Sequence, residues 1–326
     1  MTEVLLVKPF LPEHLSRFSG FPDCRFTLNP TPTQEELSRA EVIMGVPSPD
    51  LLKKAENARL FQCTNAGVDP YIKRPDLFEK GLVLCNLSGA FGTSIAEFVL
   101  CYVLMLYKHL PLYRDNQARH IWQDWGRQES PLGKQVLILG AGDIGQKCAR
   151  LFAAFSCHIT GMRRHAAPAD GLFEKIIAME GLDEALQTAD IVICALPDTI
   201  QTHKMLDKRR LCLMKRDALL INVGRGGLVD CDALAEILHN HQIRGAALDV
   251  TDPEPLPENH PLWDCENLIL TPHITGGSIG HLTQTEDTLF DICRQNLQRY
   301  LTGQPLLNRV DLQNGTRKAE ERYIAP

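Results

Sequence analysis

The stretch KQVLILGAGDIGQKCARLFAAF, residues 134–155, decides the fold. It begins with a short apolar run typical of a buried strand and ends with the apolar spacing of a helix. Between them, Gly140, Gly142 and Gly145 follow the pattern G-x-G-x-x-G. This order predicts a dinucleotide-binding unit: Gly140 makes the tight turn, Gly142 lets backbone approach a pyrophosphate, and Gly145 packs helix against strand. The alternative is a purely structural glycine turn.

Similar apolar runs lie on both sides of this stretch. Downstream, five more strand-like runs are separated by helix-like segments: CHITG, DIVICALP, ALLINVG, GAALDV and NLILTPH. Upstream, five runs alternate with helix-like pieces: VLLVK, RFTL, VIMGV, LFQCT and LVLCNL. Strands that alternate with helices predict right-handed crossovers and parallel sheets. We therefore expect an α/β fold of two Rossmann-like or flavodoxin-like doubly wound domains, with a cleft between them.

The connections between these two series predict a discontinuous first domain. A long helical pattern runs from about Gly92 to Trp122, and helices of that length commonly bridge domains or subunits. A late amphipathic stretch, residues 281–303, is expected to return the chain to the first domain. We place the first domain at residues 1–99 plus 283–326 and the inserted dinucleotide-binding domain at 100–282. The polar tail, residues 314–326, is expected to be mobile.

The composition favours small-molecule chemistry in a reducing compartment. The chain has 326 residues and a net charge of −6, with no basic run of the kind that binds nucleic acid or an anionic membrane. Its 11 cysteines form no C-x-x-C pair and no zinc-ligand spacing. The longest apolar stretch, residues 95–107, is too short to span a bilayer and contains Glu97. We expect a cytoplasmic protein with no metal.

The strand after the glycine loop indicates which dinucleotide is bound. NAD-type sites usually end this strand with Asp or Glu, which binds the ribose 2′-hydroxyl. Here the segment is CHITGMRRHAAP, and Arg163 and Arg164 stand where that carboxylate is expected. A guanidinium matches a 2′-phosphate, so the sequence predicts a preference for NADP, with NAD possible and FAD less favoured. The alternative is that both arginines only solubilise a loop.

Three later segments carry charged residues near predicted strand ends: NVGRGGLVD with Arg225, DVTDPEPLP with Glu254, and TPHITGG with His273. Each residue alone has an ordinary structural explanation. Together, in this order and behind the glycine fingerprint, they resemble the signatures of the D-isomer-specific 2-hydroxyacid dehydrogenases. The resemblance runs over nearly the whole chain.

The resemblance implies a role for each of the three residues. Reduction of a 2-keto acid needs a hydride from the nicotinamide, a proton for the carbonyl oxygen and a group that holds the carboxylate. In the family, His273 would be the general acid, Glu254 its partner and Arg225 the carboxylate anchor. A substrate such as glyoxylate or hydroxypyruvate is expected.

The resemblance also implies further contacts. In the first domain, the loop TNAGVDP would bind the substrate carboxylate through Ala66, Gly67 and Val68. A homodimer that involves the helical pattern 92–122 is implied as well. Beyond the residues already named, the expected cofactor contacts are Asp143, Ile144, Leu196, Pro197, Val223, Gly224, Asp249 and Gly276.

Two other functions remain open at this point. One is a dinucleotide-sensing binding protein like the corepressors that share this fold, although the sequence has no nuclear-localisation run and its arginines favour NADP. The other is a short-form phosphoglycerate dehydrogenase, which would want basic residues such as Lys8, Lys73 and Arg74 for a substrate phosphate. Formate dehydrogenase is disfavoured because Glu254 stands where that enzyme has Gln.

Overall fold

The chain folds into two compact units. The computed structural model describes residues 1–169, 171–277, 279, 282–313 and 323. The first unit is Met1–Phe91 with Gly277–Pro326, and the second is Gly92–Gly276, which interrupts it. The sequence placed the two boundaries after residues 99 and 282, whereas the structure places them after 91 and 276. The whole of helix α4 (Gly92–Tyr107) belongs to the second unit because it packs against α6 (Asp143–Ala153).

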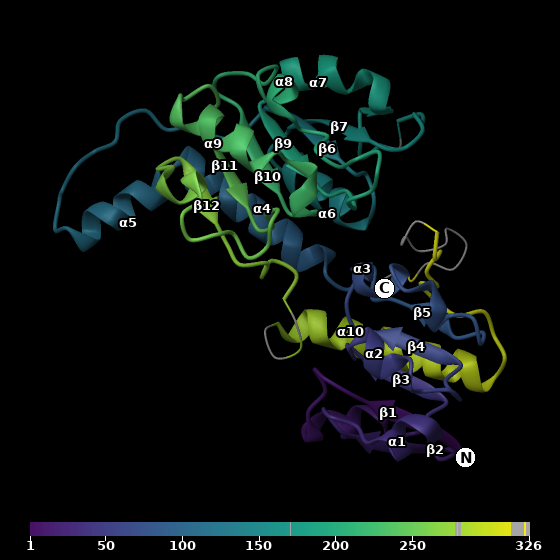
Figure 1. Cartoon of the computed structure of the whole chain (residues 1–326). Helices are drawn as coiled ribbons and strands as arrows, with labels where there is room; N and C mark the ends of the chain where they lie inside the picture. The colour runs from purple at the N-terminus through teal and green to yellow at the C-terminus, as the bar shows by residue number, and fades with distance from the viewer. Residues whose placement is uncertain (170, 278, 280–281, 314–322, 324–326) are drawn as a thin grey trace. The chain divides into compact units, whose positions relative to one another are not determined.

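The first unit is built on a five-stranded parallel sheet in the order β2-β1-β3-β4-β5 (Figure 1). This is a flavodoxin-like strand order. The five expected strands are all present: β1 (Thr2–Leu6), β2 (Cys24–Leu28), β3 (Val42–Gly45), β4 (Leu60–Cys63) and β5 (Val83–Cys85).

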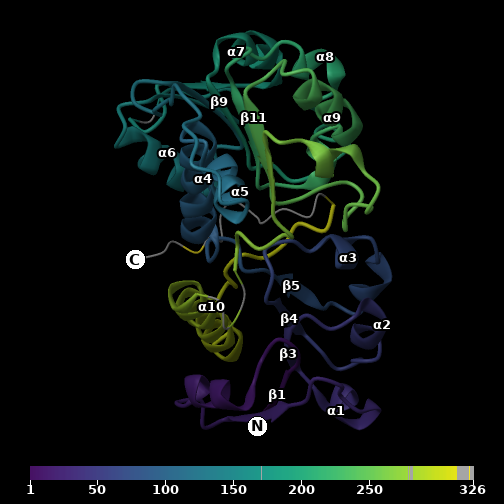
Figure 2. The same ribbon diagram turned by 90° about the vertical axis from the view of Figure 1, so that its left-hand side faces the viewer.

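Helices cover both faces of this sheet. Figure 2 shows α10 (Thr283–Leu301) on one face and α1 (Gln34–Arg39) and α2 (Pro49–Leu52) on the other. Successive strand residues point to opposite faces, so Val4 and Leu6 join the cluster that contains Phe290 of α10, while Leu5 joins the other cluster. The remaining helices of this unit are short: η1 (Pro12–Phe18), α3 (Asp69–Ile72) and η2 (Pro75–Leu77).

The second unit is built on a seven-stranded parallel sheet in the order β12-β11-β10-β9-β6-β7-β8. The chain runs outward from β6 in both directions, which places a topological switch point between β6 and β9, where ligands bind in open α/β sheets. Its strands are β6 (Gln135–Leu139), β7 (His158–Met162), β8 (Lys175–Ile177), β9 (Ile191–Cys194), β10 (Leu219–Asn222), β11 (Gly245–Leu248) and β12 (Leu268–Leu270).

The helices of the second unit separate into two layers. One face of the sheet packs against α7 (Leu182–Thr188), α8 (Lys208–Leu211) and α9 (Cys231–His239) in a continuous apolar cluster. Helix α4 packs against α6 and also contacts β10 and β11. The remaining elements are α5 (Leu110–Ala118), η3 (Met179–Gly181), η4 (Gly226–Leu228) and η5 (Pro261–Asp264).

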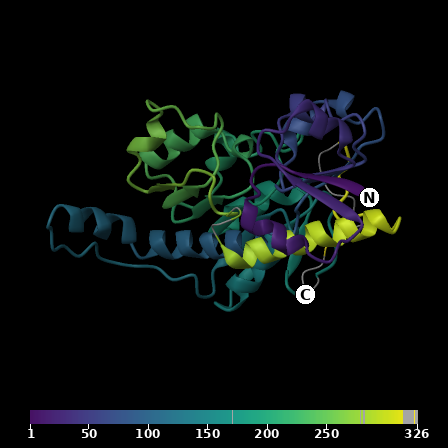
Figure 3. The same ribbon diagram turned by 90° about the horizontal axis from the view of Figure 1, so that it is seen from below.

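Two expectations for this unit were wrong. The sequence predicted six strands, and the structure adds the edge strand β8, whose three residues are too few to show a pattern. The sequence also predicted one helix from Gly92 to about Trp122, but the chain bends by 69° between α4 and α5. His109 at the bend is left-handed (φ 57°), and Pro111 in the first turn of α5 excludes a continuous helix. Figure 3 shows α5 continuing beyond the end of α4.

Among the described residues, no single helix is long and apolar enough to cross a membrane, although the bent pair α4 and α5 passes that test by length and composition alone. Most of the tail, residues 314–322 and 324–326, lies outside the described residues, so its expected mobility is untested. Tyr323 is described and is buried, and its Oη donates to Asp291 Oδ2 at 2.8 Å.

Candidate active site

The predicted site residues of the second unit all follow the carboxyl ends of its strands. The glycine loop follows β6, Arg163 and Arg164 follow β7, Arg225 follows β10, and His273 follows β12. Parallel strands end at one edge of the sheet, so the fold gathers these segments along that edge. The other predicted contacts lie there too: Leu196 and Pro197 after β9, Val223 and Gly224 after β10, Asp249 after β11, and Gly276 after β12.

The glycine loop has the shape that a dinucleotide needs. Gly140 has φ 110°, which a residue with a side chain rarely adopts, and a Cβ on Gly145 would collide with the carbonyl oxygen of Gly140. A Cβ on Gly142 would meet nothing within 4 Å, so open space lies beside the start of α6. Asp143 and Ile144 form the first turn of that helix. A cradle open at Gly142, at a helix N-terminus, fits a pyrophosphate.

Arg163 lies against this loop. Its Nε donates to the carbonyl oxygen of Ala141 at 3.1 Å, and its side chain is partly buried. Arg164 is exposed. The hydrogen bond to Ala141 fixes one edge of the Arg163 guanidinium beside the cofactor loop, which is where a ribose 2′-phosphate is expected.

His273 and Glu254 form a hydrogen-bonded pair. Nδ1 of His273 lies 2.7 Å from Oε1 of Glu254, and their side chains are 52% and 43% exposed. Among the described residues, Glu254 is the hydrogen-bond partner of the imidazole. A carboxylate on Nδ1 holds a proton there and fixes the ring orientation. The opposite nitrogen, Nε2, is then the one suited to exchange a proton with a ligand.

The turn that carries His273 is built around Asp249, which is buried with 2% exposure. Oδ1 of Asp249 accepts from Thr271 Oγ1 at 2.7 Å and from Ile274 N at 2.9 Å. Oδ2 accepts from Thr275 N at 3.1 Å and from Thr275 Oγ1 at 2.6 Å. These four bonds use the four acceptor positions of a carboxylate. Contact between Asp249 and the nicotinamide therefore stays a prediction from the family resemblance.

The Arg225 segment is a tightly packed turn. The buried side chain of Asn222 donates from Nδ2 to the carbonyl oxygen of Arg225 at 2.9 Å, and Arg225 Nη1 donates to Gly224 O at 2.8 Å. A Cβ on Gly226 would collide with the backbone of Thr251, in the segment that leads to Glu254. Close packing thus ties the turn after β10 to the one after β11. Arg225 itself is half-buried, as suits a group that binds a ligand from a fixed position.

The predicted substrate loop belongs to the first unit. Ala66, Gly67 and Val68 lie between β4 and α3, at the carboxyl end of β4. Asn86 Nδ2 donates to Ala66 O at 2.7 Å and braces this turn. Its role in carboxylate binding stays a prediction. Among the described residues, no group of three His, Cys, Asp or Glu side chains is arranged to hold a metal ion.

Sequence reasoning missed the residues that hold the His273 turn. Thr271 and Thr275 flank His273 and bind Asp249, and Tyr102 and Ser94 of α4 bind those two threonines. The threonines have a weak signal, since both lie two residues from the histidine in TPHIT. Tyr102 and Ser94 stand in an apolar helix and have none, because only the fold brings α4 to this turn.

Comparison with known proteins gives consistent matches. A family model described as D-isomer specific 2-hydroxyacid dehydrogenase, NAD binding domain, matches residues 100–275. Glyoxylate/hydroxypyruvate reductase B of Pectobacterium atrosepticum is 33% identical over 271 residues, which are 81% of this chain and 82% of that protein.

Solved structures show the same similarity. A D-isomer specific 2-hydroxyacid dehydrogenase family protein from Aeromonas salmonicida matches with a TM-score of 0.85 at 31% identity, covering 95% of this chain and 99% of that one. The NADPH-dependent glyoxylate/hydroxypyruvate reductase of Sinorhizobium meliloti, solved with NADP and sulfate, matches with a TM-score of 0.81 at 26% identity. That match covers 97% of this chain and 100% of the other.

Proposed function

Because this chain belongs to the D-isomer specific 2-hydroxyacid dehydrogenase family, we propose that it reduces a small 2-keto acid, glyoxylate or hydroxypyruvate, to the D-2-hydroxy acid. The chain is an NAD(P)-dependent dehydrogenase of this family. The observation that carries the proposal is the pair of His273 and Glu254 on the strand edge that also presents Arg225. Two similar proteins are glyoxylate/hydroxypyruvate reductases, which supports the substrate class.

His273 supplies the proton in this mechanism. A bound nicotinamide would supply the hydride for the carbonyl carbon, and the carbonyl oxygen would then need a proton. Protonated His273 donates to that oxygen from Nε2, while Glu254 keeps the proton on Nδ1. In the reverse direction the neutral imidazole accepts the proton from the hydroxyl group.

Arg225 holds the substrate carboxylate. Its guanidinium offers two parallel N–H donors to a carboxylate. Hydrogen bonding and close packing in this turn fix the backbone of Arg225. Substrate binding therefore has to order only the side chain of Arg225. Arg225 also lies close in sequence to Val223 and Gly224, so one turn is assigned to both substrate and cofactor.

The same proposal includes a preference for NADPH. Arg163 is fixed beside Ala141, Arg164 is exposed one residue later, and the family's usual carboxylate is absent from this strand end. We expect the double variant Arg163→Asp with Arg164→Ala to shift the ratio of kcat/KM for NADPH over NADH toward NADH by at least about tenfold. Steady-state rates with each cofactor measure this, and an unchanged ratio would contradict the proposed role of both arginines.

The first test is reduction of a panel of keto acids, followed at the nicotinamide absorbance. The panel holds glyoxylate, hydroxypyruvate, pyruvate, phenylpyruvate and 3-phosphohydroxypyruvate, each with NADPH and with NADH. Preference for glyoxylate or hydroxypyruvate supports the proposal, and preference for 3-phosphohydroxypyruvate replaces it with a phosphoglycerate dehydrogenase. Tight dinucleotide binding without turnover would favour a sensing protein instead.

The variant His273→Ala tests the assignment of the acid. Loss of a general acid lowers rates by about 10²–10⁴-fold, and cofactor affinity is expected to stay within a factor of about two because the imidazole holds no part of the dinucleotide. Cofactor fluorescence gives the affinity and steady-state assays give kcat. If more than about a tenth of the turnover remains, another group donates the proton.

Assembly and compartment complete the proposal. Apolar side chains are exposed on α5 and the stretch after it, among them Trp122, Ile121 and Leu110, and a second copy of this chain is the proposed partner. Light scattering of the purified protein measures the mass directly. All eleven cysteines are free thiols, which supports a reducing compartment such as the cytoplasm.

A further inference from the structure

Helix α4 bonds the His273 turn at two points. Ser94 Oγ donates to the carbonyl oxygen of Thr275 at 2.7 Å, and both residues are buried. Two helical turns further along, Tyr102 Oη lies 2.7 Å from Thr271 Oγ1. Thr271 and Thr275 are two residues before and two residues after His273, so the helix is hydrogen-bonded to the turn on both sides of the histidine.

The hydrogen bonds from Tyr102 form a chain with a fixed direction. A threonine hydroxyl has one hydrogen, and that of Thr271 goes to Oδ1 of Asp249 at 2.7 Å. Tyr102 must then donate to Thr271. Burial raises the pKa of Tyr102 to about 12, so the phenol keeps this proton at neutral pH. The two hydrogen bonds, from Tyr102 to Thr271 and from Thr271 to Asp249, strengthen each other because each bond polarises the next.

This chain ends on the carboxylate that organises the turn. Asp249 accepts from the backbone N–H groups of Ile274 and Thr275, and its own carbonyl oxygen accepts from His273 N at 2.9 Å. His273 needs such support because its φ of 56° is left-handed, a conformation that costs a non-glycine residue energy. The turn therefore depends on bonds from outside itself to keep the imidazole in place.

We propose that Tyr102 and Ser94 are positioning residues, through which α4 holds His273 in the geometry for proton transfer. The inference rests on the proposed function, since it concerns the residue assigned as the acid. Their hydroxyl groups bond Thr275 and Thr271, so in this proposal they act through the turn.

The test compares two tyrosines of the same helix. Tyr102→Phe removes the hydroxyl that bonds Thr271, while Tyr107→Phe removes an equally buried hydroxyl that has no hydrogen-bond partner among the described residues. We expect Tyr102→Phe to lower kcat by about three- to tenfold with the KM for cofactor unchanged, and Tyr107→Phe to leave both constants unchanged. Ser94→Ala, which removes the second bond, is expected to act like Tyr102→Phe.

A second readout needs no turnover. Hydrogen exchange of the cofactor-free protein reports opening of the amides of Ile274 and Thr275. We expect the peptide that covers residues 271–277 to exchange about three- to tenfold faster in Tyr102→Phe than in the wild type or Tyr107→Phe. Equal exchange and equal kcat in the two tyrosine variants would overturn the inference.

The double variant Tyr102→Phe with His273→Ala separates the two proposals. If Tyr102 acts through His273, its removal lowers kcat no further once the imidazole is gone. A further three- to tenfold loss in the double variant would mean that Tyr102 acts elsewhere, which also overturns the inference. High turnover in His273→Ala alone would instead refute the proposed function, while faster exchange in Tyr102→Phe would still show that α4 anchors the turn.

Discussion

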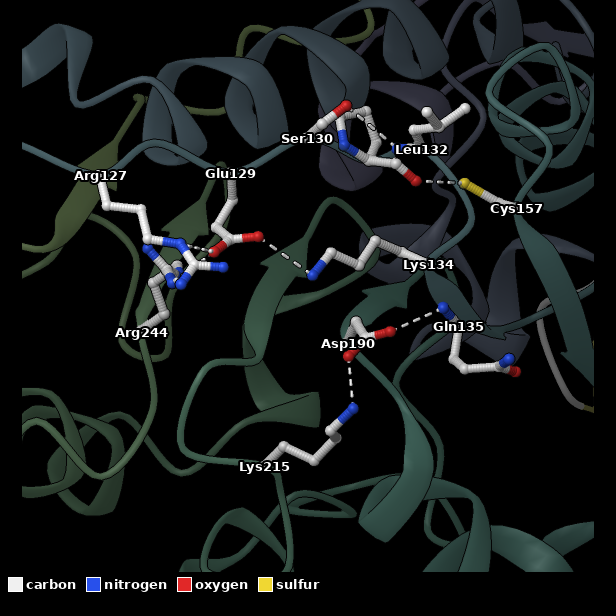
Figure 4. Close-up of polar contacts among 11 residues, drawn as sticks. Arg127, Glu129, Ser130, Leu132, Lys134, Gln135, Cys157, Asp190, Lys215 and Arg244 are labelled. Atoms are coloured by element: carbon white, nitrogen blue, oxygen red, sulfur yellow. Dashed lines mark hydrogen bonds and ion pairs between the residues drawn. The ribbon is translucent and has the colours of Figure 1, made fainter.

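The two edges of the seven-stranded sheet hold charge in opposite ways. At the amino ends of the strands, Asp190 accepts from Gln135 N at 2.8 Å and from Lys215 Nζ, while Glu129 pairs with Lys134 and Arg244 (Figure 4). The Asp190 and Glu129 carboxylates are largely buried. At the carboxyl ends, His273 and Glu254 are about half exposed. The two carboxylates at the amino edge are thus paired inside the protein, whereas the His273–Glu254 pair at the carboxyl edge is accessible to solvent.

This difference separates stability from function within one sheet. When one member of a buried ion pair is removed, the other charge is left without a partner, and the folded protein loses stability. Charges that are half exposed contribute little to stability but are available to a ligand. Variants at the carboxyl edge should therefore lose activity while staying folded, and variants at the amino edge should lose stability while staying active.

Among the variants that test this comparison of the two edges, the largest expected effect is at Arg225. Arg225→Ala removes the charge that holds the substrate carboxylate, and we expect kcat/KM to fall by about 10²–10³-fold, as when other preorganised donors are removed from active sites. The melting temperature should change little, because the turn is held by Asn222 and by packing of Gly226. If Arg225→Ala lowered kcat/KM equally for a carboxylate substrate and for its uncharged amide, the loss would come from damage to the turn and the carboxylate anchor would be refuted.

A smaller effect is expected at the amino edge. Lys215→Met leaves the Asp190 carboxylate without its cation, and we expect the free energy of unfolding to fall by about 1–3 kcal/mol with kcat unchanged. Denaturation in urea measures this. Lys208→Met is the matched control, because its pair with Glu236 is exposed on both sides and should contribute almost nothing. Loss of activity in Lys215→Met at full stability would break the comparison.

The same pair gives an expected pH dependence. Its hydrogen bond to Asp190 raises the pKa of Lys215 above the ordinary 10.5. The folded protein therefore holds this proton more tightly than the unfolded chain, and the contribution is present in full below about pH 10. It is lost as the pH rises through the folded-state value, so wild type and Lys215→Met should converge in stability in that range.

The smallest effect is expected at Gly142. A Cβ there meets no protein atom within 4 Å, so Gly142→Ala should fold with wild-type stability. It should nevertheless weaken NADPH binding by about tenfold, or ~1.4 kcal/mol, because the methyl group occupies space that the pyrophosphate needs. Titration of cofactor fluorescence gives the affinity. Unchanged affinity would mean that the phosphates lie elsewhere.

Local patterns predicted most of the fold. Each short apolar run that was predicted as a strand forms one, because four or five apolar residues between turn signals are most stable when buried in a parallel sheet. Strand β8 was not predicted, because its three residues show no pattern of their own and it is a strand only through its pairing with β7. The break before α5 was visible in Pro111, but the apolar spacing on both sides of the proline favoured one helix.

The site was predictable only where its chemistry repeats a known spacing. Glycines, arginine, glutamate and histidine carry that signal, and the structure places His273 and Glu254 in hydrogen-bond contact. Their roles in catalysis stay predictions. The support behind them was not predictable, since Ser94 and Thr275 are separated by 181 residues and meet only in the folded chain.

The interruption of the first unit by the second has a consequence for synthesis on the ribosome. The second unit is one continuous segment, so it has every residue of its sheet once residue 276 has been made. The first unit is completed later. Buried Asn296 of α10 donates to Gln62 Oε1 at 2.6 Å, and Arg309 forms an antiparallel β-bridge with Cys85, the last residue of β5. The strands of residues 1–91, although translated before the second unit, therefore acquire their last packing partners only after that unit has been made, and they depend on protection from aggregation until then.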